Sequence, residues 1–406
     1  MSFRISLSGM NAASSDLNVT SNNIANANTT GFKESRAEFA DVFAVSAYGG
    51  SQNAIGAGVR LAKVAQQFGQ GNIDFTGKTL DMALSGRGFF TLSNQGAQVY
   101  SRAGNFGADR DGFVVNPAGH RLQVYAPTPS GVGFDTGRMI DLRLSTNDSP
   151  PRATSSIDVL TNLPANATPP TITPVDPNDP VTYNHTTSLT VYDSLGASHS
   201  QSMYYVKTAN PNEWQVHTYI DGNAIGAPQT LQYSGTGALV APATGRLALP
   251  PYDPGNGSVP MNITLELGDS TQYGERFAVA SLSQDGYTTG RLSGVEVSAE
   301  GIVSARYTNG VSTPLGQVAL TSFANPQGLT SQGDNVWSES FESGQARRGA
   351  AGSSDFGSVQ GGALEASNVD MTAQLVNMIT AQRNFQANAQ MISTQDQITQ
   401  AVINIR

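Results

Sequence analysis

The sequence predicts a multidomain, mainly β protein, with nested β-domains and with N- and C-terminal α-helices that form a coiled-coil-like terminal domain. Three observations lead to this fold class. Both ends carry apolar residues at helical spacing. The middle alternates short apolar runs with turn residues. Finally, 43 glycines and 20 prolines among 406 residues suit turn-rich β-structure, and this length corresponds to about two to four domains.

The N-terminal segment predicts a helix from about residue 3 to residue 24. At about 1.5 Å per residue it would be roughly 33 Å long, and it should end within residues 26–31, where Asn and Gly favour turns. Ser14 and Ser21 interrupt its apolar seam. A single seam stabilises an isolated helix little, so this helix needs a partner. The seam consists of Phe3, Leu7, Met10, Leu17 and Ile24.

The C-terminal segment predicts a second helix with the same alternation of three and four residues. The polar Gln382 and Asp396 occupy two positions of its seam. We expect the two seams to pack against each other and to govern polymerisation with neighbouring copies of the chain, giving a homo-oligomer. The apolar members of this second seam are Met371, Leu375, Met378, Phe385, Ala389 and Ile392.

The remaining faces of both helices are almost uncharged. Residues 1–28 carry only Arg4 and Asp16, and residues 364–406 carry only five charged side chains. A solvated helix normally has a charged outer face. Two interpretations stay open at this point: a polar helix pair on the surface of one domain, or dense packing of both helices against other subunits.

Composition excludes several functional classes. The net charge of −9 and the 13% content of charged residues disfavour nucleic-acid binding. No apolar run has membrane-spanning length, so membrane insertion is not expected. The first residues lack the pattern of a secretory signal, so if the chain leaves the cell we expect export without a cleaved signal peptide. The absence of cysteine excludes disulfides and thiolate chemistry.

The middle of the chain reads as two β-regions separated by proline-rich sequence. Residues 59–126 alternate strands with glycine turns, 127–180 are rich in proline, and 188–220 suggest a separate β-sandwich or barrel. Strand patterns at 295–323 return to the first β-region. The expected parts are a helical polymerisation domain (1–30 and 362–406), an extended connector (31–70 and 330–361), an inner β-domain (71–145 and 285–329) and an outer inserted β-domain (146–284).

No residue pattern indicates catalysis, a cofactor or a metal. His120, His185, His199 and His217 have no metal-ligand spacing, although three of them lie in one expected domain. Residues 109–112 resemble the start of a calcium loop but lack its downstream acidic ligands, which favours a hairpin turn. Nucleophile elbows and phosphate-binding loops are missing as well. We therefore expect that the protein is not an enzyme.

Two long motifs at opposite ends of the chain resemble the signatures of flagellar axial proteins, the family that builds the rod and the hook. The first is SNNIANANTTGFK (residues 21–33). The second is GALEASNVDM (362–371), followed by MITAQRNFQANA (378–389). Gln374 departs from the acidic residue expected in many members, so no ion pair is carried over to it. The motif residues are Asn22, Asn23, Ile24, Ala25, Asn26, Gly31, Phe32, Asn368, Val369, Asp370, Gln382 and Arg383.

Within this family the insertion at 146–284 favours the hook over the rod, whose members are generally shorter. Residues 192–199, 286–292 and 315–329 also resemble the hook branch. The resemblance implies a structural subunit of the hook, an extracellular curved tube that acts as a universal joint between motor and filament. It further implies type III export and contacts with the distal rod protein, the hook cap protein and the hook–filament junction protein. The alternatives are a distal rod protein or, from another class, a secreted adhesin-like binding module.

Overall fold

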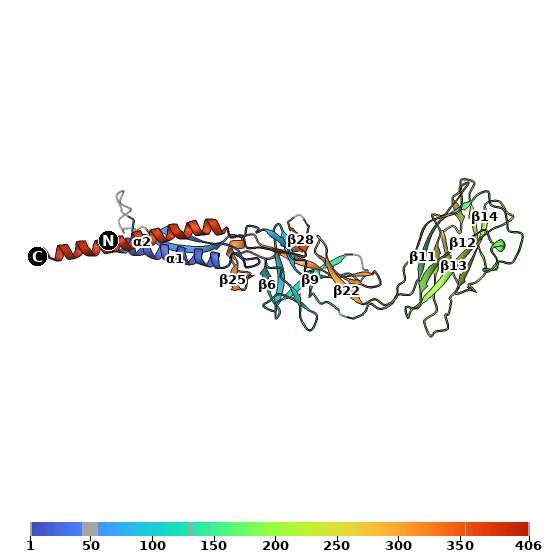
Figure 1. The fold of residues 1–406 in the computed structure, drawn as a ribbon, viewed down its shortest axis with the longest axis horizontal. Helices are drawn as coiled ribbons and strands as arrows, with labels where there is room; N and C mark the ends of the chain where they lie inside the picture. Colours follow the sequence, from blue (N-terminus) through green and yellow to red (C-terminus); the bar gives the residue numbers. More distant parts are fainter. Residues whose placement is uncertain (1, 43–55, 130–132, 146, 354, 405–406) are drawn as a thin grey trace. The chain divides into compact units, whose positions relative to one another are not determined.

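The computed structural model describes residues 2–42, 56–129, 133–145, 147–353 and 355–404. Residues 43–55, part of the expected connector, lie outside the described residues. Figure 1 shows a long helix at each end of the chain and strands through most of the sequence between them. The predicted fold class, mainly β with terminal helices, is confirmed.

The chain divides into two compact units. Unit 1 consists of Met1–Thr146, Gly294–Arg306 and Ser312–Arg406, and unit 2 consists of Asn147–Ser293 and Tyr307–Val311. Unit 2 is therefore inserted into the sequence of unit 1. The finer division into four nested parts stays a prediction.

The two helices, α1 (Ser2–Ala25) and α2 (Met371–Asn404), pack side by side in unit 1 (Figure 1). They run antiparallel. Asn23 near the end of α1 meets Gln374 near the start of α2. Further along, a Cβ added at Gly9 would lie 2.6 Å from Asn388 Oδ1. The helices therefore approach each other closely where the side chains are small.

The start of α2 is capped by a family-motif residue. Asp370 Oδ1 accepts hydrogen bonds from the backbone N–H groups of Thr372 (2.8 Å) and Ala373 (3.1 Å). Such a cap satisfies N–H groups that have no partner within the helix. Neither described helix is long and apolar enough to cross a membrane.

A 12-stranded sheet forms the body of unit 1. It joins strands from both sides of the insertion, because β24 (Ser312–Ser322) pairs with β9 (Arg121–Pro127) and β5 (Phe89–Asn94). Apolar side chains from these strands form its core, including Phe90, Val124 and Leu320. Its other strands are β6 (Ala97–Ser101), β7 (Gly107–Ala108), β8 (Val114–Val115), β10 (Phe134–Asp141), β22 (Leu292–Val297), β23 (Ile302–Tyr307), β25 (Thr330–Gly333), β26 (Val336–Ser338) and β27 (Arg347–Ala350).

Three short antiparallel pairs lie between the helices and this sheet in sequence. Strand β1 (Ser35–Asp41) pairs with β2 (Val59–Gln66), and α1 contacts both. These strands fall in the segment that the sequence suggested as an extended connector. The other pairs join the two halves of unit 1: β3 (Ile73–Phe75) with β29 (Ala363–Glu365), and β4 (Met82–Ser85) with β28 (Ser358–Gly361).

Unit 2 contains two sheets around one apolar core. Alternate residues of β14 (Glu213–Ile220) are buried, as expected for a strand with one face in a core. The core draws on both sheets, for example through Trp214 and Leu265. One sheet contains β11 (Ser156–Pro164), β18 (Arg246–Ala248), β19 (Thr264–Glu266), β20 (Thr271–Tyr273) and β21 (Ala278–Gln284). The other contains β12 (His185–Tyr192), β13 (Ser198–Lys207), β14 (Glu213–Ile220), β15 (Asn223–Ala224), β16 (Gln229–Tyr233) and β17 (Leu239–Ala241).

Candidate assembly site at the paired helices

Both terminal helices leave large apolar side chains exposed. Phe3 on α1 is 51% exposed, and Leu375 on α2 is 49% exposed. The exposed side chains belong to helices with few charges, so water meets mostly apolar, amide and hydroxyl groups there. Scattered exposed apolar residues are ordinary, but here they follow α2 along its length and also occupy the first two turns of α1. They are Phe3, Leu7, Met371, Leu375, Val376, Ile379, Met391, Ile398 and Ile403.

The buried seam of α2 differs from the predicted seam: at two predicted positions, the residue one place earlier in the sequence is the buried one. Gln374 and Ala381 are buried, whereas the neighbouring Leu375 and Gln382 are exposed. Small or amide side chains thus occupy the closest approach, and the larger apolar ones flank it or face away. The predicted seam residues that are half-buried are Met10, Leu17, Ile24, Met378, Phe385, Ala389 and Ile392.

The two family motifs meet in a polar network where α1 ends and α2 begins. Asn23 is 1% exposed and pairs with the backbone of Ser35 through two hydrogen bonds, Nδ2 to the Ser35 oxygen (2.7 Å) and the Ser35 N–H to Oδ1 (2.9 Å). The same Asn23 Nδ2 also donates to Gln374 Oε1. Gln374 Nε2 in turn donates to Glu34 Oε1 at 2.8 Å. One amide on each helix therefore links α1, α2 and the start of β1.

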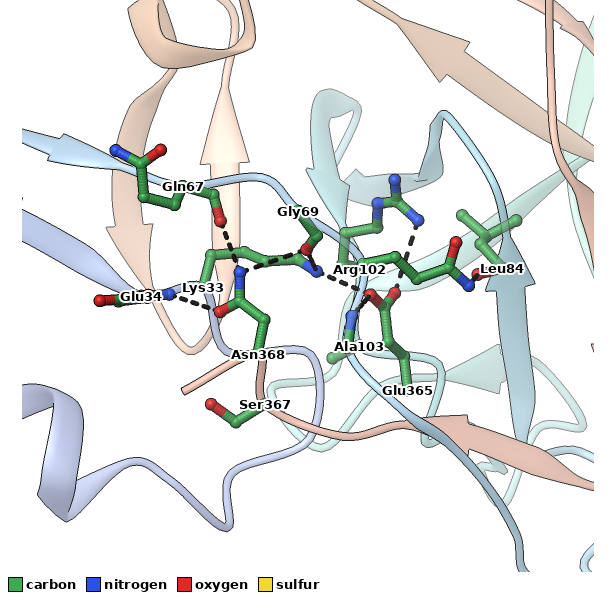
Figure 2. A network of polar contacts seen from close by, with 12 residues as sticks. Lys33, Glu34, Gln67, Gly69, Leu84, Arg102, Ala103, Glu365, Ser367 and Asn368 are labelled. Atoms are coloured by element: carbon green, nitrogen blue, oxygen red, sulfur yellow. Dashed lines mark hydrogen bonds and ion pairs between the residues drawn. The ribbon is translucent and has the colours of Figure 1, made fainter. Parts of the chain in front are cut away.

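Asn368, from the C-terminal motif, continues this network (Figure 2). Its Oδ1 accepts from the Glu34 N–H at 2.7 Å, and its Nδ2 donates to the backbone oxygens of Gln67 (2.8 Å) and Gly69 (3.2 Å). Three backbone groups, from segments that precede and follow the β1–β2 pair, thus converge on one side chain. Asn368 therefore fixes where the chain enters α2.

A buried ion pair lies beside Asn368 (Figure 2). Lys33 Nζ contacts Glu365 Oε1 at 2.7 Å, and both side chains are fully buried. The same Nζ donates to the Gly69 oxygen at 2.7 Å, and Arg102 Nη1 reaches Glu365 Oε2 at 3.4 Å. Burial lowers the pKa of Lys33, and the carboxylate of Glu365 opposes this shift. A buried charge of this kind persists only when it is paired.

Gly31 makes room for this junction. Its φ of +69° lies in the left-handed region, and an added Cβ would lie 2.5 Å from the backbone nitrogen of Ala103. Its N–H also donates to the Glu365 backbone oxygen at 2.8 Å. The motif therefore needs glycine here for both conformation and space.

Comparison with known proteins identifies the family. The chain is 40% identical to the flagellar hook protein FlgE of Escherichia coli (strain K12) over 100% of both chains. It is 34% identical to that of Rhizobium meliloti (99% of this chain, 98% of the relative) and 31% identical to that of Borreliella burgdorferi (98% of each). The chain belongs to the flagellar hook protein family.

Family models for parts of hook and rod proteins match along the chain. They are described as flagella basal body rod protein (residues 3–33), flagellar hook protein FlgE/F/G D1 domain (83–173), flagellar basal body protein FlaE D2 domain (162–287) and flagellar basal body rod FlgEFG protein C-terminal (360–405). The crystal structure of Helicobacter pylori flagellar hook protein FlgE2 has a similar fold, with a TM-score of 0.54 and 15% identity over 72% of this chain and 100% of that chain.

Several hook-family motif residues have positions that the network explains, and others do not. Asn23, Gly31, Asn368 and Asp370 hold the junction together. Asn26 donates back to the Asn22 oxygen at 3.0 Å near the end of α1. Ile24, Phe32 and Val369 are half-buried. Asp370 is exposed as well as capping α2, and the other exposed motif residues are Asn22, Ala25, Gln382 and Arg383.

The sequence interpretation missed the charged half of the junction. Lys33, Arg102 and Glu365 were not assigned a role, nor was Glu34, the partner of Gln374. A signal was present, since charged residues are rare near both motifs of this hook subunit. Their partners lie hundreds of positions away, so spacing alone does not pair them.

The histidines of unit 2 have separate environments. His185 stacks on Phe277 with ring centroids 4.4 Å apart. His199 lies between Asp193 and Asp221. Within the described part of the chain, no group of three or more His, Cys, Asp or Glu side chains is arranged to hold a metal ion.

Proposed function

We propose that this hook subunit polymerises through α1 and α2 into a helical tube. The supporting observation is the set of large apolar side chains that the paired helices leave exposed on almost uncharged surfaces. Fully burying such a side chain contributes about 1.5–3 kcal/mol. Contacts between different patches of successive copies, without ring closure, produce an open helix. Leu17, Ile24, Met378, Phe385 and Ile392 would then support the pair, while Leu375 and Phe3 would face neighbours.

The tube would act as a curved universal joint that carries motor torque to the filament. A joint of this kind needs a stiff inner layer whose subunits do not lose their shape under load. The polar network and the Lys33–Glu365 ion pair would supply that stiffness by fastening the helices to the β-strands of unit 1. Polar contacts between β-domains, mediated by water, would exchange at low cost as the tube rotates.

The same proposal extends to location and partners. The subunit would be exported without a cleaved signal peptide and assembled outside the cell beneath a hook cap protein. It would contact the distal rod protein at one end of the hook and the hook–filament junction protein at the other. Weakly charged helices with apolar seams would stay poorly stabilised until neighbouring copies cover them.

A leucine-to-alanine pair of variants tests the polymerisation surface. In Leu375→Ala the exposed side chain on α2 is removed without altering the buried contacts of Gln374. We expect folded subunits that no longer form tubes at concentrations where the unaltered chain does. Leu195→Ala, a change of an exposed leucine in unit 2, is the matched control and should form tubes normally.

Electron microscopy of the assembled protein and circular dichroism of the monomer provide the measurements. Curved tubes with α1 and α2 innermost are expected for the unaltered chain. Normal tubes from Leu375→Ala would contradict the proposed surface. Global unfolding of that variant would also contradict it, because Leu375 would then stabilise the monomer and not the assembly.

A further inference from the structure

The turn between β26 and β27 is held by two serines. The Ser340 N–H donates to Ser343 Oγ at 3.0 Å, and the Ser343 N–H donates to Ser340 Oγ at 3.2 Å. Ser343 Oγ also donates to the Ser340 backbone oxygen at 2.8 Å, and the Glu342 N–H donates to Ser340 Oγ at 3.1 Å. These reciprocal bonds give the turn one defined conformation.

The turn is also attached to the chain behind it. Asn325 Nδ2 donates to the Glu342 oxygen at 3.0 Å, and the Asn325 N–H donates to the Ser343 oxygen at 3.2 Å. A Cβ added at Gly328 would lie 2.5 Å from the Glu342 carbonyl carbon, so the two segments are in close contact. Ser343 is completely buried. The tip of this turn therefore sits on a rigid support.

Phe341 stands at that tip without any cover. Its exposed fraction is 102%, the largest among the exposed apolar residues of the described chain. Exposed carboxylates flank it on both sides, Glu339 and Glu342. A bare aromatic ring on a rigid turn costs solubility in a monomer. In an interface the same arrangement is favourable, because the backbone that carries the ring is already ordered and loses little conformational freedom on binding.

We propose that Phe341 is an anchor that inserts into an apolar recess on a neighbouring copy of this chain. This inference rests on the proposed polymerisation. A second copy is the occupant we infer, because the turn belongs to unit 1, the same compact unit as α1 and α2. The helices that gather neighbouring subunits therefore bring this turn with them. The carboxylates of Glu339 and Glu342 require a receiving surface that offers basic side chains or backbone N–H groups around the recess.

Site-specific photo-crosslinking tests the contact directly. The photoreactive p-benzoyl-phenylalanine replaces Phe341, and isotope-labelled and unlabelled subunits are mixed, assembled into tubes and irradiated. We expect crosslinked peptides that join a labelled to an unlabelled chain, in tubes but not in monomers at the same concentration. Tubes that give crosslinks only within one chain, or no crosslinks at all, would overturn the inference.

Substitutions supply an independent readout. Phe341→Ala should raise the critical concentration for tube formation by about tenfold or more, the size expected for losing an interface anchor. Phe341→Tyr keeps the aromatic ring, so its critical concentration should be close to that of the unaltered chain. Thermal unfolding of both monomeric variants should match that of the unaltered chain, since the ring has no intrachain cover. An unchanged critical concentration for Phe341→Ala would refute the anchor while leaving the Leu375 surface intact, so the two proposals fail separately.

Discussion

Asn23 on α1 and Gln374 on α2 lie 351 positions apart and share a buried hydrogen bond, with 3.2 Å between Asn23 Nδ2 and Gln374 Oε1. Gln374 Oε1 therefore accepts a hydrogen bond from Asn23, and Gln374 Nε2 donates one to Glu34. A carboxylate at position 374 would keep the acceptor but lose the donor. The amide is therefore the side chain that suits the neighbour Glu34.

Gln374→Glu should loosen the attachment of α2 to β1. The new carboxylate would face Glu34 without a hydrogen bond, at a cost of about 1–3 kcal/mol for the lost buried partner. Hydrogen exchange of the first turns of α2 measures this, and we expect faster exchange than in the unaltered chain. Gln382→Glu, at an exposed position on the same helix, is the control.

Exchanging the two groups should restore the junction. In the double variant Glu34→Gln and Gln374→Glu, the amide and the carboxylate change places, so one donor again meets one acceptor. We expect hydrogen exchange close to that of the unaltered chain. Additive loosening in the double variant would show that the Glu34–Gln374 contact does not determine the effect.

Lys33→Ala should destabilise unit 1 strongly. It removes the 2.7 Å partner of Glu365 and leaves a fully buried carboxylate with Arg102 at 3.4 Å. The expected loss is about 3–5 kcal/mol in the free energy of unfolding. Urea unfolding followed by Trp337 fluorescence, in a Trp214→Phe background, reports on this unit. Lys63→Ala, at an exposed lysine, should change little, and equal losses for both would contradict the role of the ion pair.

Gly31→Ala tests the close approach of the N-terminal motif. Alanine at position 31 would have to adopt a left-handed φ, and its Cβ would also clash with Ala103. Gly119→Ala is the control, because Gly119 has a similar φ of +83° but no heavy atom within 4 Å of an added Cβ. We expect Gly31→Ala to be more destabilising by about 1–3 kcal/mol, the usual cost of overpacking. The same urea titration measures the difference. Equal effects would mean that the backbone angle alone selects glycine.

His199 should stabilise unit 2 at low pH, and this contribution should be lost as pH rises above neutral. Its Nδ1 lies 2.6 Å from Asp221 Oδ2, and its Nε2 lies 3.4 Å from Asp193 Oδ2. Burial lowers the pKa of His199, but hydrogen bonds to Asp221 and Asp193 outweigh it, so its pKa is raised. The stabilisation is therefore complete below the unfolded pKa of about 6.5 and is lost as pH rises through the folded pKa.

His199→Gln should remove this pH dependence. Unfolding of unit 2 is followed by Trp214 fluorescence, in a Trp337→Phe background, between about pH 5 and pH 8. His217→Gln is an informative control, because burial lowers the pKa of His217 and its contribution has the opposite sign. If the free energy of unfolding of His199→Gln changes with pH as steeply as that of the unaltered chain, the contacts of His199 with Asp193 and Asp221 do not cause the pH dependence.

Unit 2 should in contrast lose stability in acid through Asp193. Burial raises the pKa of this carboxyl, but hydrogen bonds from Asn256, His199 and the backbone lower it to about 2. The contribution is present above the unfolded pKa of about 3.9 and is lost as pH falls toward 2. Asp193→Asn should reduce stability at pH 5 and make the loss on acidification smaller, which thermal unfolding measures.

Local patterns predicted the elements but not their partners. The helical spacing predicted a helix at each end, with bounds for α1 that agree to within one residue at either end and a start for α2 at Met371. The predicted four-three seam nevertheless missed Gln374 and Ala381, the positions that α1 covers. Periodicity marks where apolar residues lie on a helix, whereas burial depends on which residues let the second helix come close.

By itself the sequence determined that the ends are helical and that the middle is β, because these follow from spacing and residue type along short stretches. The family was indicated by the resemblance of the two end motifs. Only the tertiary structure decided that Lys33 neutralises Glu365 and that Gln374 serves both Asn23 and Glu34. It also decided that Leu375 stays exposed. The physical reason is that pairing and burial are set by distances between chain segments that sequence spacing does not contain.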